Sequence, residues 1–401
     1  MKLVIFCHPP FLASQSMPRF AEMLRSSFEA LGHEVEMSAP QPRFHRLLAG
    51  RRHAKWAGYI DQYLIFPLQV RKSLASAPPD TMFVFADQAL GPWIPLLKNR
   101  PHVVHVHDLL NLRSALGEGT GHVTSLSGRI YQRYIRRGFR KARHFISVSK
   151  KTRDDLHKYG EVEALTSDVV YNGLNFPYRP MAQEDAFKEL REAGLPVSAR
   201  GMLLHVGGGQ WYKNQRGLIA LYARYATDVK DPLPLWCIGP KPNAAIARAL
   251  EKLPAGGRVS FFQNLDNTTL QAAYSYARAF LFPSLAEGFG WPLIEAQACG
   301  CPVITTDEPP MNEVAGGAAI YIPRLQSNAN IDMWASQGAD ALRELLSLDP
   351  DERQELVQRG CGWVKRFDAG IAIAQYLEIY KKIFDAEMSR SNAEALKGLS
   401  R

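Results

Sequence analysis

The segment 279–305 constrains the fold more than any other part of the chain, because it is typical of a strand, a tight turn, a helix and a second strand. Residues 279–282 are an apolar run suited to a buried strand, and residues 302–305 resume one. Pro292 suits the first turn of a helix, where a missing N–H group costs nothing, and Gly300 suits the helix end. The turn therefore follows the carboxyl end of a strand and opens a helix, the usual ligand position in open α/β sheets.

Two acidic residues flank this turn. Glu287 and Glu295 are separated by seven residues, and Gly288 and Gly290 follow the first acid closely. The glycines let the backbone approach a ligand, and a helix start offers partial positive charge to a phosphate. Glu295 could accept hydrogen bonds from a pair of ribose or sugar hydroxyls, and Glu287 could do the same for another sugar. Either acid alone would more often be an ordinary solvated side chain, so the inference depends on the whole segment.

The segment closely resembles the signature of the retaining, nucleotide-sugar-dependent glycosyltransferases of family 4, in which Gly-Phe-Gly follows the first of two such glutamates. The resemblance extends over most of the chain, and the C-terminal half carries nearly all of its specificity. It implies an α/β GT-B fold, in which two Rossmann-like doubly wound domains face a deep interdomain cleft. It also implies a nucleotide-diphosphate sugar as the donor substrate, so no cofactor is expected.

The resemblance assigns roles in donor binding. Glu295 would bind the ribose, and Glu287 would bind the transferred sugar as a catalytic residue. Relatives contact the sugar and phosphates through main-chain N–H groups at the positions of Phe289, Gly290 and Leu293. They bind the base through the backbone of the loop that here contains Leu265. The retaining outcome rests on the resemblance alone, and Glu287 is not assigned as a nucleophile.

A second glycine-rich segment, residues 205–214, follows a strand and opens a helix. Its glycines allow close backbone approach, and Lys213 would place a cation beside a diphosphate. Gly207 and Lys213 match the family pattern of a strand, Gly, five residues and Lys, but Gly208 stands where many members have Arg. The segment is not a P-loop, which needs Ser or Thr after the lysine. The alternative for Lys213 is an ordinary exposed lysine at a helix start.

A departing diphosphate can be stabilised by a metal that carboxylates hold, or by basic side chains and helix N-termini. The sequence favours the second solution, with Lys213 as the catalytic cation, so we expect no metal. Asp349 and Asp351 frame a proline in the pattern of the acidic pair that metal-dependent glycosyltransferases use. We interpret this pattern as a helix start, where the dipole favours acidic residues.

The N-terminal half offers two further candidates. His107, followed by Asp108, ends a predicted strand, and from there it could hydrogen-bond the donor sugar or a phosphate. The family often has His-Asp here; a satisfied structural histidine is the alternative. The turn after the first strand has Ser14, Gln15 and Ser16 where many members have paired glycines. We expect a hydroxyl such as that of Ser16 to contact the diphosphate, with a plain N-capping loop as the alternative.

Strand-like and helix-like segments alternate along both halves, which argues for parallel sheets covered by helices. We expect an N-terminal acceptor-binding domain at 1–175 and a C-terminal nucleotide-sugar-binding domain at 176–368. By resemblance, residues 369–401 would contain a last helix, 369–387, that crosses back to the N-terminal domain, and 389–401 would be a loose tail. The predicted strands are 2–6, 33–37, 82–85, 103–107, 144–148 and 168–171, then 202–206, 233–238, 258–262, 279–282 and 302–305; the clearest helix is 17–31.

Composition sets the broad class. The chain has 401 residues, 46% apolar and 22% charged, as is ordinary for a globular protein of two domains. Its first residues predict a strand rather than a secretory signal, and no apolar run approaches the roughly 18 residues of a spanning helix. The five cysteines form no zinc pattern. We expect a cytoplasmic protein. A peripheral position on the inner face of the membrane is compatible with this expectation.

The positive charge is concentrated in the N-terminal half. Residues 1–180 hold 25 Lys and Arg against 14 Asp and Glu, whereas residues 181–401 hold 23 against 25. The clusters 43–55 and 129–143 mix basic with apolar or aromatic residues, which suits an anionic membrane surface or a phosphate-bearing lipid acceptor. Nucleic acid or a merely solvated basic helix would also fit. We favour the membrane over nucleic acid because the resemblance requires an acceptor on this half.

The sequence therefore predicts a retaining, metal-independent glycosyltransferase that uses a glycan or lipid-linked acceptor in surface polysaccharide, lipopolysaccharide or glycolipid assembly. Two alternatives remain open at this point. One is a nucleotide-sugar 2-epimerase, which shares the GT-B architecture. The other is a catalytically silent scaffold that binds nucleotide sugar, which the departures at residues 14–16 and 208 keep open.

Overall fold

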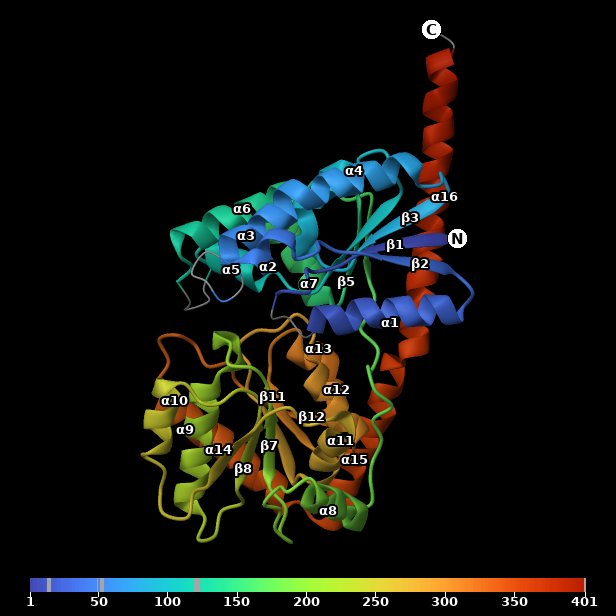
Figure 1. The fold of residues 1–401 in the computed structure, drawn as a ribbon. Coiled ribbons are helices and arrows are strands. Elements are labelled where there is room, and N and C mark those ends of the chain that lie inside the picture. The colour runs from blue at the N-terminus through green and yellow to red at the C-terminus, as the bar shows by residue number, and fades with distance from the viewer. Residues whose placement is uncertain (13–15, 49, 51–53, 119–122, 400–401) are drawn as a thin grey trace. The chain divides into compact units, whose positions relative to one another are not determined.

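The structure is a computed structural model that describes residues 1–12, 16–48, 50, 54–118 and 123–399, without the side chains of Ser16 and of residues 391–399. The chain divides into two compact units. One comprises Met1–Tyr171 and Gly370–Arg401, and the other Asn172–Ala369; the sequence prediction placed these divisions after residues 175 and 368. Each unit contains a parallel sheet with helices on both faces (Figure 1).

The sheet of the N-terminal unit has six strands in the order β2-β1-β3-β4-β5-β6, all paired in parallel. β3 and β4 are buried along their whole length, as their unbroken β-branched and aromatic runs require when helices cover both faces. All six predicted strands of this half are confirmed within two residues at each end. Their bounds are Lys2–Phe6 (β1), Glu34–Ser38 (β2), Thr81–Phe85 (β3), His102–Val106 (β4), His144–Ser147 (β5) and Thr166–Val169 (β6).

Helices α1 and α4 lie on opposite faces of this sheet (Figure 1). α1 ends just before Gly32, whose φ of 80° is the left-handed conformation that glycine adopts most readily. Residues 54–76 form one nearly continuous rod, in which the π-helical η1 links α3 to α4. The helical bounds are Ser16–Ala30 (α1), Arg43–Leu47 (α2), Ala54–Ile60 (α3), Asp61–Ile65 (η1), Phe66–Ser76 (α4), Gln88–Leu97 (η2), Leu110–Ala115 (α5), Leu126–Phe139 (α6), Lys150–Asp155 (α7) and Leu156–Gly160 (η3).

The last helix, α16, runs from Ala369 to Leu399 and packs on the N-terminal unit. Tyr376 and Tyr380 are fully buried there, and the Tyr380 hydroxyl lies 2.5 Å from Nε2 of His105. The prediction of a loose tail after residue 388 is wrong. Residues 388–399 contain no proline and several good helix formers, so nothing in them ends the helix before Gly398.

The sheet of the C-terminal unit has the order β12-β11-β10-β7-β8-β9, again entirely parallel. Five strands match the prediction, and β12 was missed because its short run, Ala-Ile-Tyr-Ile, follows a glycine pair without a clear helix before it. The bounds are Leu203–Val206 (β7), Leu235–Ile238 (β8), Val259–Phe262 (β9), Ala279–Phe282 (β10), Val303–Thr306 (β11) and Ala319–Ile322 (β12).

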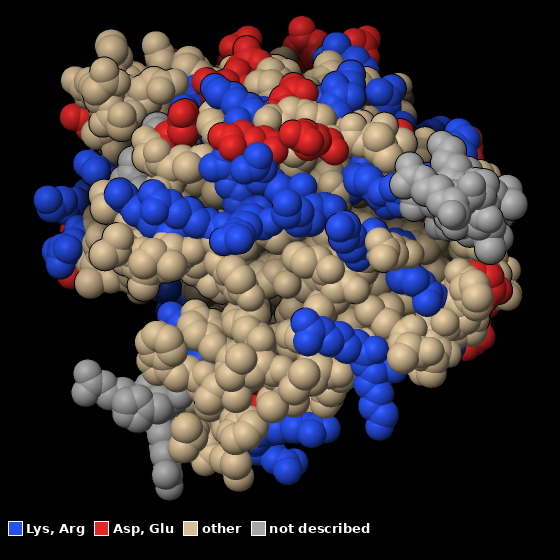
Figure 2. Space-filling model, turned by 90° about the horizontal axis from the view of Figure 1, so that it is seen from above, with Lys and Arg blue, Asp and Glu red and all other residues tan. Residues whose placement is uncertain are grey.

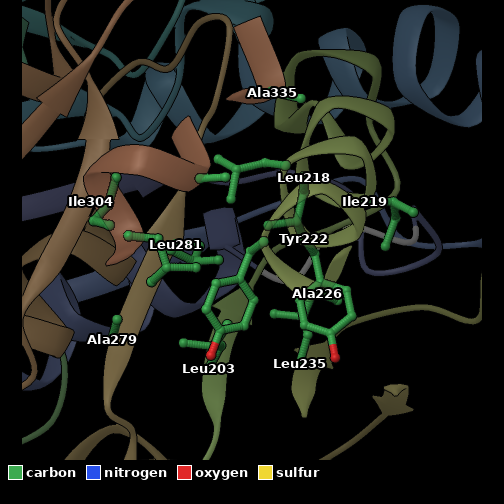
Figure 3. Packing of buried hydrophobic residues seen from close by; sticks show 14 of the residues in the cluster. Leu203, Leu218, Ile219, Tyr222, Ala226, Leu235, Ala279, Leu281, Ile304 and Ala335 are labelled. Atoms are coloured by element: carbon green, nitrogen blue, oxygen red, sulfur yellow. The ribbon is translucent and has the colours of Figure 1, made fainter. Parts of the chain in front are cut away.

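The core of this unit lies between the sheet and helices α9 and α14. Figure 3 shows Leu203, Leu235 and Leu281 of the strands pointing toward Leu218 and Tyr222 of α9. The helical bounds are Gln183–Glu192 (α8), Trp211–Lys213 (η4), Gln215–Asp228 (α9), Ala244–Leu250 (α10), Asn267–Tyr276 (α11), Trp291–Ala298 (α12), Met311–Ala315 (α13), Gly316–Ala318 (η5), Ile331–Ser347 (α14), Pro350–Trp363 (α15) and Val364–Phe367 (η6).

Candidate functional site

The strand order of the C-terminal unit reverses between β7 and β10, which are neighbours in the sheet. In such sheets the loops after the two strands diverge and leave room for a ligand at their carboxyl ends. The loop after β7 carries Gly207, Gly208 and Lys213, and the loop after β10 carries Glu287. The two sequence segments singled out above thus meet at the topological switch point.

Lys213 and Glu287 form an ion pair across these loops. The Lys213 Nζ lies 2.9 Å from Oε1 of Glu287 and 3.1 Å from Oε2, and the two side chains are 13% and 8% exposed. Lys213 also lies over the ring of Phe282, with Nζ 5.0 Å from the centroid. Lys213 is therefore no exposed helix-start lysine, and the solvated-acid alternative for Glu287 is excluded as well.

Asn214, which sequence reasoning had not singled out, fixes the position of this pair. Its φ of 53° is left-handed, and its side-chain oxygen accepts the N–H of Gly217 at 3.1 Å, which caps α9. Its amide nitrogen donates to the Pro283 carbonyl at 2.9 Å, so one side chain joins the two loops. The N–H of Leu285 donates to the Tyr212 carbonyl at 2.7 Å and adds a second tie.

The glycines after β7 serve close packing within the protein. The N–H of Gly207 donates to the Ile238 carbonyl at 3.0 Å, and a Cβ at Gly207 would lie 2.9 Å from Nε2 of His205. His205 donates from Nδ1 to the Leu281 carbonyl at 2.9 Å, and its Nε2 has no hydrogen-bond partner among the described residues. Burial lowers the pKa of His205 to about 4, so the ring stays neutral and Nε2 remains an acceptor. A Cβ at Gly208 would meet only the flexible Gln210 side chain.

Glu295 lies in the second turn of α12, with its side chain turned into the protein. It is 6% exposed, and the Tyr274 hydroxyl donates to its Oε2 at 2.9 Å. Burial, followed by the charge of Glu295, raises the pKa of Tyr274 well above its usual value, so the phenol remains a donor. The alternative of a solvated helix acid is wrong, and the ribose-binding role stays a prediction.

The turn between the two glutamates has the conformation that its sequence predicts. Gly290 has a φ of 98°, and Pro292 lies in the first turn of α12, as predicted. Phe289 is buried and packs edge-on against Phe367 at 5.8 Å. The N–H of Leu293 donates to the Gly290 carbonyl at 3.0 Å and closes the turn, and the predicted contact of Leu293 with a donor stays a prediction. Gly288 lies within the same turn.

Leu265 lies in the loop between β9 and α11, where Asn264 has a left-handed φ of 58° and Asp266 caps the helix through the N–H of Thr269. The structure gives no contact between Leu265 and the Lys213–Glu287 pair. β9 is two strands away from β7 in the sheet, which corresponds to about 10 Å. A nucleoside that extends along the carboxyl ends of the strands would cover such a distance.

In the N-terminal unit, His107 directly follows β4 and is buried. Its Nε2 donates to the Ala86 carbonyl at 2.9 Å, and Phe20 packs edge-on against its ring at 4.5 Å. Burial lowers the pKa of His107, while the charge of Asp87 opposes that effect. These contacts favour the structural alternative for His107; its role toward a donor stays a prediction.

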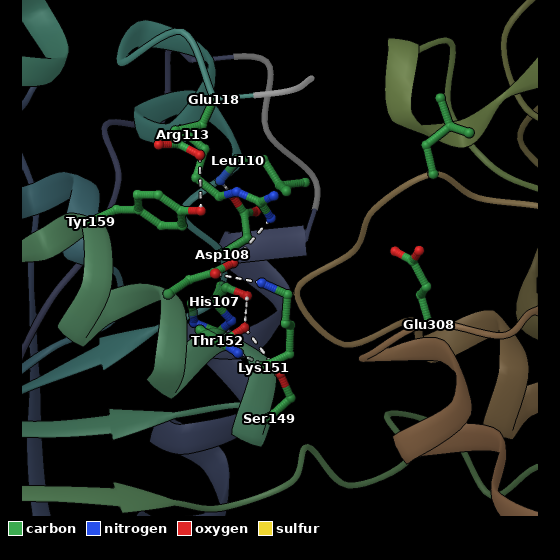
Figure 4. Close-up of polar contacts among 12 residues, drawn as sticks. His107, Asp108, Leu110, Arg113, Glu118, Ser149, Lys151, Thr152, Tyr159 and Glu308 are labelled. Atoms are coloured by element: carbon green, nitrogen blue, oxygen red, sulfur yellow. Dashed lines mark hydrogen bonds and ion pairs between the residues drawn. The ribbon is translucent and has the colours of Figure 1, made fainter. Parts of the chain in front are cut away.

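A polar cluster surrounds His107 in Figure 4. Asp108 accepts the N–H of Leu110 at 3.0 Å and so orders the loop after β4. Arg113 and Lys151 both pair with Asp155, and the Thr152 hydroxyl donates to the His107 carbonyl at 3.4 Å. Ser16 begins α1, but its side chain, like Ser14 and Gln15 as a whole, lies outside the described residues, so the predicted diphosphate contact stays a prediction.

Two negative findings concern metals and membranes. Within the described part of the chain, no three His, Cys, Asp or Glu side chains gather in a way that could hold a metal ion. Asp349 is the N-cap of α15 and forms a capping box with Glu352, which confirms its interpretation as a helix start. None of the described helices combines the length and the apolar character needed to cross a bilayer.

Two Rossmann-like units, each with a six-stranded parallel sheet between helices, are the architecture of the GT-B fold, and comparisons with known proteins agree. Residues 186–360 match the glycosyl transferases group 1, and residues 17–176 match glycosyltransferase family 4. Together the two models match most of the chain, which belongs to the family that they describe.

The relatives include O-antigen glycosyltransferases. The O-antigen chain mannosyltransferase RfbU of Salmonella typhimurium is 26% identical over 57% of this chain and 58% of its own length. O-antigen chain mannosyltransferase B of Escherichia coli is 23% identical over 63% of this chain and 64% of its own length. The matches thus span less than two thirds of either relative. The sucrose-phosphate synthase of Thermosynechococcus elongatus, 17% identical, superposes with a TM-score of 0.72 over 96% of this chain and 100% of that one, which shows the shared fold.

Proposed function

We propose that this glycosyltransferase transfers a sugar from a nucleotide-diphosphate sugar to a glycan or lipid-linked acceptor with retention of configuration. The observation that carries the proposal is the Lys213–Glu287 pair at the switch point of the C-terminal unit. A cation and a carboxylate held side by side match the two ends of the reacting group, the departing diphosphate and the sugar that acquires positive charge. The match to O-antigen mannosyltransferases supports a role in surface polysaccharide or glycolipid assembly.

In this proposal Lys213 stabilises the departing diphosphate, and Glu287 accepts hydrogen bonds from the sugar hydroxyls. Glu295, held by Tyr274, would accept hydrogen bonds from the ribose. The main-chain groups around Gly288, Phe289 and Gly290 would complete the contacts with the donor. Glu287 acts by binding and electrostatics, and no nucleophile is assigned.

The proposal includes catalysis without a metal, because Lys213 supplies the charge that a divalent ion would otherwise supply. Activity measured after EDTA treatment tests this part. We expect less than a twofold change, and a loss of about tenfold or more that manganese restores would contradict it.

An exposed apolar surface on the N-terminal unit supports the part of the proposal that concerns a lipid-linked acceptor and a peripheral position on the cytoplasmic side of a membrane. Trp56, Ile60, Leu64 and Leu68 follow one another every four residues along α3, η1 and α4, and they are 66%, 37%, 62% and 61% exposed. The wider π-helical turn of η1 helps to keep these residues on one side of the rod.

Helix α6 adds a second exposed apolar row, Leu126, Ile130 and Tyr134, at 75%, 58% and 45% exposure. Helix α6 lies beside η1, since the Tyr63 hydroxyl of η1 is 2.7 Å from the Tyr131 hydroxyl of α6, and we treat the two rows as parts of one surface. Arg129, Arg133 and Arg137 are exposed on α6 as well, and Lys and Arg form a band across the face drawn in Figure 2. We name the exposed residues of α3, η1, α4 and α6 the apolar–basic surface; its composition suits anionic lipid headgroups.

The proposed reaction is tested in two steps. UDP, GDP, ADP and dTDP are first compared for their effect on the thermal unfolding of the protein, since a specific ligand stabilises the folded state. The sugar donors of the preferred nucleotide are then offered with an isoprenoid-diphosphate-linked sugar. Glu287→Ala is expected to lower turnover by at least about 100-fold and to keep the fold.

The outcomes separate the alternatives. Formation of an epimer from the donor alone would identify a 2-epimerase. Nucleotide binding with neither transfer nor donor hydrolysis would identify a silent scaffold, and near-normal turnover of Glu287→Ala would end the assignment of that residue.

A further inference from the structure

Side chains from neighbouring segments hold the loop that follows β10 and carries Glu287. Each main-chain carbonyl from Phe282 to Leu285 accepts a hydrogen bond from one of them. The donors are Oγ1 of Thr305 to Phe282 at 2.9 Å, Nδ2 of Asn214 to Pro283 at 2.9 Å, Oγ1 of Thr306 to Ser284 at 2.8 Å and Nε of Arg324 to Leu285 at 2.8 Å. The loop is therefore a fixed support for Glu287.

Arg324 differs from the other three donors. Thr305 and Thr306 are fully buried and Asn214 is 6% exposed, and all three are neutral. Arg324 carries a full positive charge, and its side chain is 18% exposed. A single hydrogen bond to the Leu285 carbonyl needs no charge, since the amide of a glutamine could make it. The bond to Leu285 therefore does not explain why a guanidinium is present at this position.

Most of the donor capacity of this guanidinium is unused. Arginine has N–H groups on Nε, Nη1 and Nη2, and only Nε donates to Leu285. Neither Nη1 nor Nη2 has a hydrogen-bond partner among the residues that the structure describes. Oε2 of Glu308 lies 3.8 Å from Nε, and the Glu308 side chain is 44% exposed, so this ion pair contributes little. The two Nη groups are thus available to a ligand.

The position of Arg324 in the sheet indicates which part of a donor it would meet. β7 lies on one side of β10, and β11 and β12 lie on the other. Lys213 contacts Glu287 from the loop after β7, whereas Arg324 follows β12 by two residues and reaches the same loop from the opposite side. With its base at the loop after β9 and its diphosphate at Lys213, a donor would have its sugar end nearest to Arg324. All of these residues belong to the C-terminal unit.

We propose that Arg324 binds an oxyanion at the sugar end of the donor, beside Glu287. This inference rests on the proposed function and adds the chemical class of a group that the donor site takes. The planar fork of a guanidinium matches two oxygens of a carboxylate or a phosphate. Two parts of a donor could supply such oxygens: the carboxylate of an acidic sugar, or the phosphate that is bonded to the sugar.

Arg324→Gln separates an anion site from a simple tie between loops. The amide nitrogen of glutamine is as far along the side chain as Nε of arginine, so this variant can keep the bond to Leu285 while it lacks the fork. Calorimetric titration compares three ligands that carry the base preferred by the wild type: the nucleoside diphosphate, a nucleotide-linked hexose and a nucleotide-linked hexuronic acid. At least one of them should bind about tenfold more weakly or worse, as expected when hydrogen bonds to a charge are lost.

The pattern across the three ligands identifies the source of the oxyanion. If Arg324 binds the phosphate, all three ligands should weaken by a similar factor, because all three contain it. If Arg324 binds a sugar carboxylate, only the hexuronic acid should weaken, and the wild type should bind it more tightly than the hexose. Affinities of Arg324→Gln within twofold of the wild type for all three ligands would overturn the inference.

Two control variants exclude other effects of the charge. If Arg324 served only as the partner of Glu308, Glu308→Gln would lose as much affinity as Arg324→Gln, and that result would count against an anion site. We expect Glu308→Gln instead to bind at least as tightly as the wild type, because a competing acid is gone. Arg359→Gln removes an exposed arginine of α15 and should bind all three ligands normally.

Thermal unfolding without ligand shows whether the variants are folded. If Arg324→Gln is not, Arg324→Lys takes its place, since lysine keeps the charge but not the planar fork. Its loss of affinity should be smaller than a tenfold loss but measurable, and an unchanged affinity for all three ligands would refute the inference. If the wild-type protein bound none of the three ligands, the proposed function would be contradicted instead, so the two failures are distinguishable.

Discussion

At the scale of single residues, the Lys213–Glu287 pair is the main support for the proposed function. Its contribution to the stability of the folded protein can be predicted as well. Both side chains are nearly buried, so removing one charge leaves the other without compensation. We expect Lys213→Met and Glu287→Gln each to lower the free energy of unfolding by about 3 kcal/mol. The double variant should lose clearly less than the sum, because no uncompensated charge remains.

Urea unfolding of the four proteins measures this coupling. The exposed pair of Lys188 and Glu192, 3.9 Å apart with side chains 76% and 65% exposed, is the matched control. Its removal should have no measurable effect. Strictly additive losses at Lys213 and Glu287 would show that the two charges do not interact in solution.

Tyr274 helps to fix the position of Glu295. Its buried hydroxyl donates to Oε2 of Glu295 at 2.9 Å, and Tyr274→Phe would leave the carboxylate without this donor. A hydrogen bond to a buried charge is worth about 1.5–3 kcal/mol, so the unfolding midpoint should fall. If Glu295 binds the ribose, the dissociation constant of the preferred nucleotide should rise by about tenfold.

Calorimetric titration and thermal unfolding check both parts of this prediction. Tyr276→Phe is the control, because that hydroxyl donates to the Ser198 carbonyl rather than to Glu295. A variant that loses stability but keeps its nucleotide affinity would remove Glu295 from the binding site.

At the scale of elements, α16 packs on the N-terminal unit through Tyr376 and Tyr380, and a buried carboxylate, that of Glu387, adds a polar attachment. Oε2 of Glu387 accepts from Arg143 at 2.7 Å and from Arg390 at 2.8 Å, and Oε1 lies 3.0 Å from Nε2 of His144. Burial raises the pKa of Glu387, but the hydrogen bond from His144 and the two arginines outweigh it and lower the pKa. Burial lowers the pKa of His144. Both groups therefore favour folding at neutral pH and oppose it in acid.

The pH dependence follows from these directions. Because folding lowers the pKa of the Glu387 carboxyl, the unfolded chain takes up a proton at a higher pH than the folded chain does. Glu387 therefore stabilises the folded state above its ordinary pKa of about 4.5, and this stabilisation is lost as the pH falls below that value. The stabilisation that depends on a neutral His144 begins to be lost as the pH falls below the ordinary histidine pKa of about 6.5. Glu387→Gln should lower the melting temperature at pH 7, and its difference from the wild type should shrink below pH 4.5.

Thermal unfolding between pH 7 and pH 4 tests this. Glu378→Gln on the same helix is the control, because Glu378 is exposed and forms an exposed ion pair with Lys382. A difference between Glu387→Gln and the wild type that stays constant with pH would mean that Glu387 acts through packing rather than charge.

The same elements show how far the sequence alone could lead. All described strands except β12, and the two glycine-rich turns, were predictable, because apolar runs, Pro292 and Gly290 act through local chemistry. That the N–H of Leu293 closes the turn could not be predicted, since which main-chain groups do so depends on the actual dihedral angles of the turn. Arg324 and Leu285 are 39 residues apart, and only the pairing of β11 with β10 and with β12 brings them together. A single sequence contains no signal for such a pair.

At the scale of the whole molecule, the excess of positive charge in the N-terminal half and the apolar–basic surface both favour binding to an anionic membrane. Anionic headgroups would attract the arginines, each worth about 1 kcal/mol near such a surface, and leucines that enter the bilayer would add about 1.5–3 kcal/mol each. Neither contribution depends on a nucleotide, so we expect binding to vesicles without any substrate.

Vesicles that contain phosphatidylglycerol therefore provide the last test. The wild-type protein should sediment with them, less so at high salt and little with vesicles of phosphatidylcholine alone, because salt screens the charge contribution. Leu64→Glu and Leu68→Glu should each weaken binding about tenfold or more, since each places a charge where an apolar side chain would enter the bilayer. Met333→Glu, at an equally exposed apolar residue of the C-terminal unit (63%), is the control and should bind normally. Equal binding of all three variants, or binding to RNA in preference to vesicles, would assign this surface to another partner.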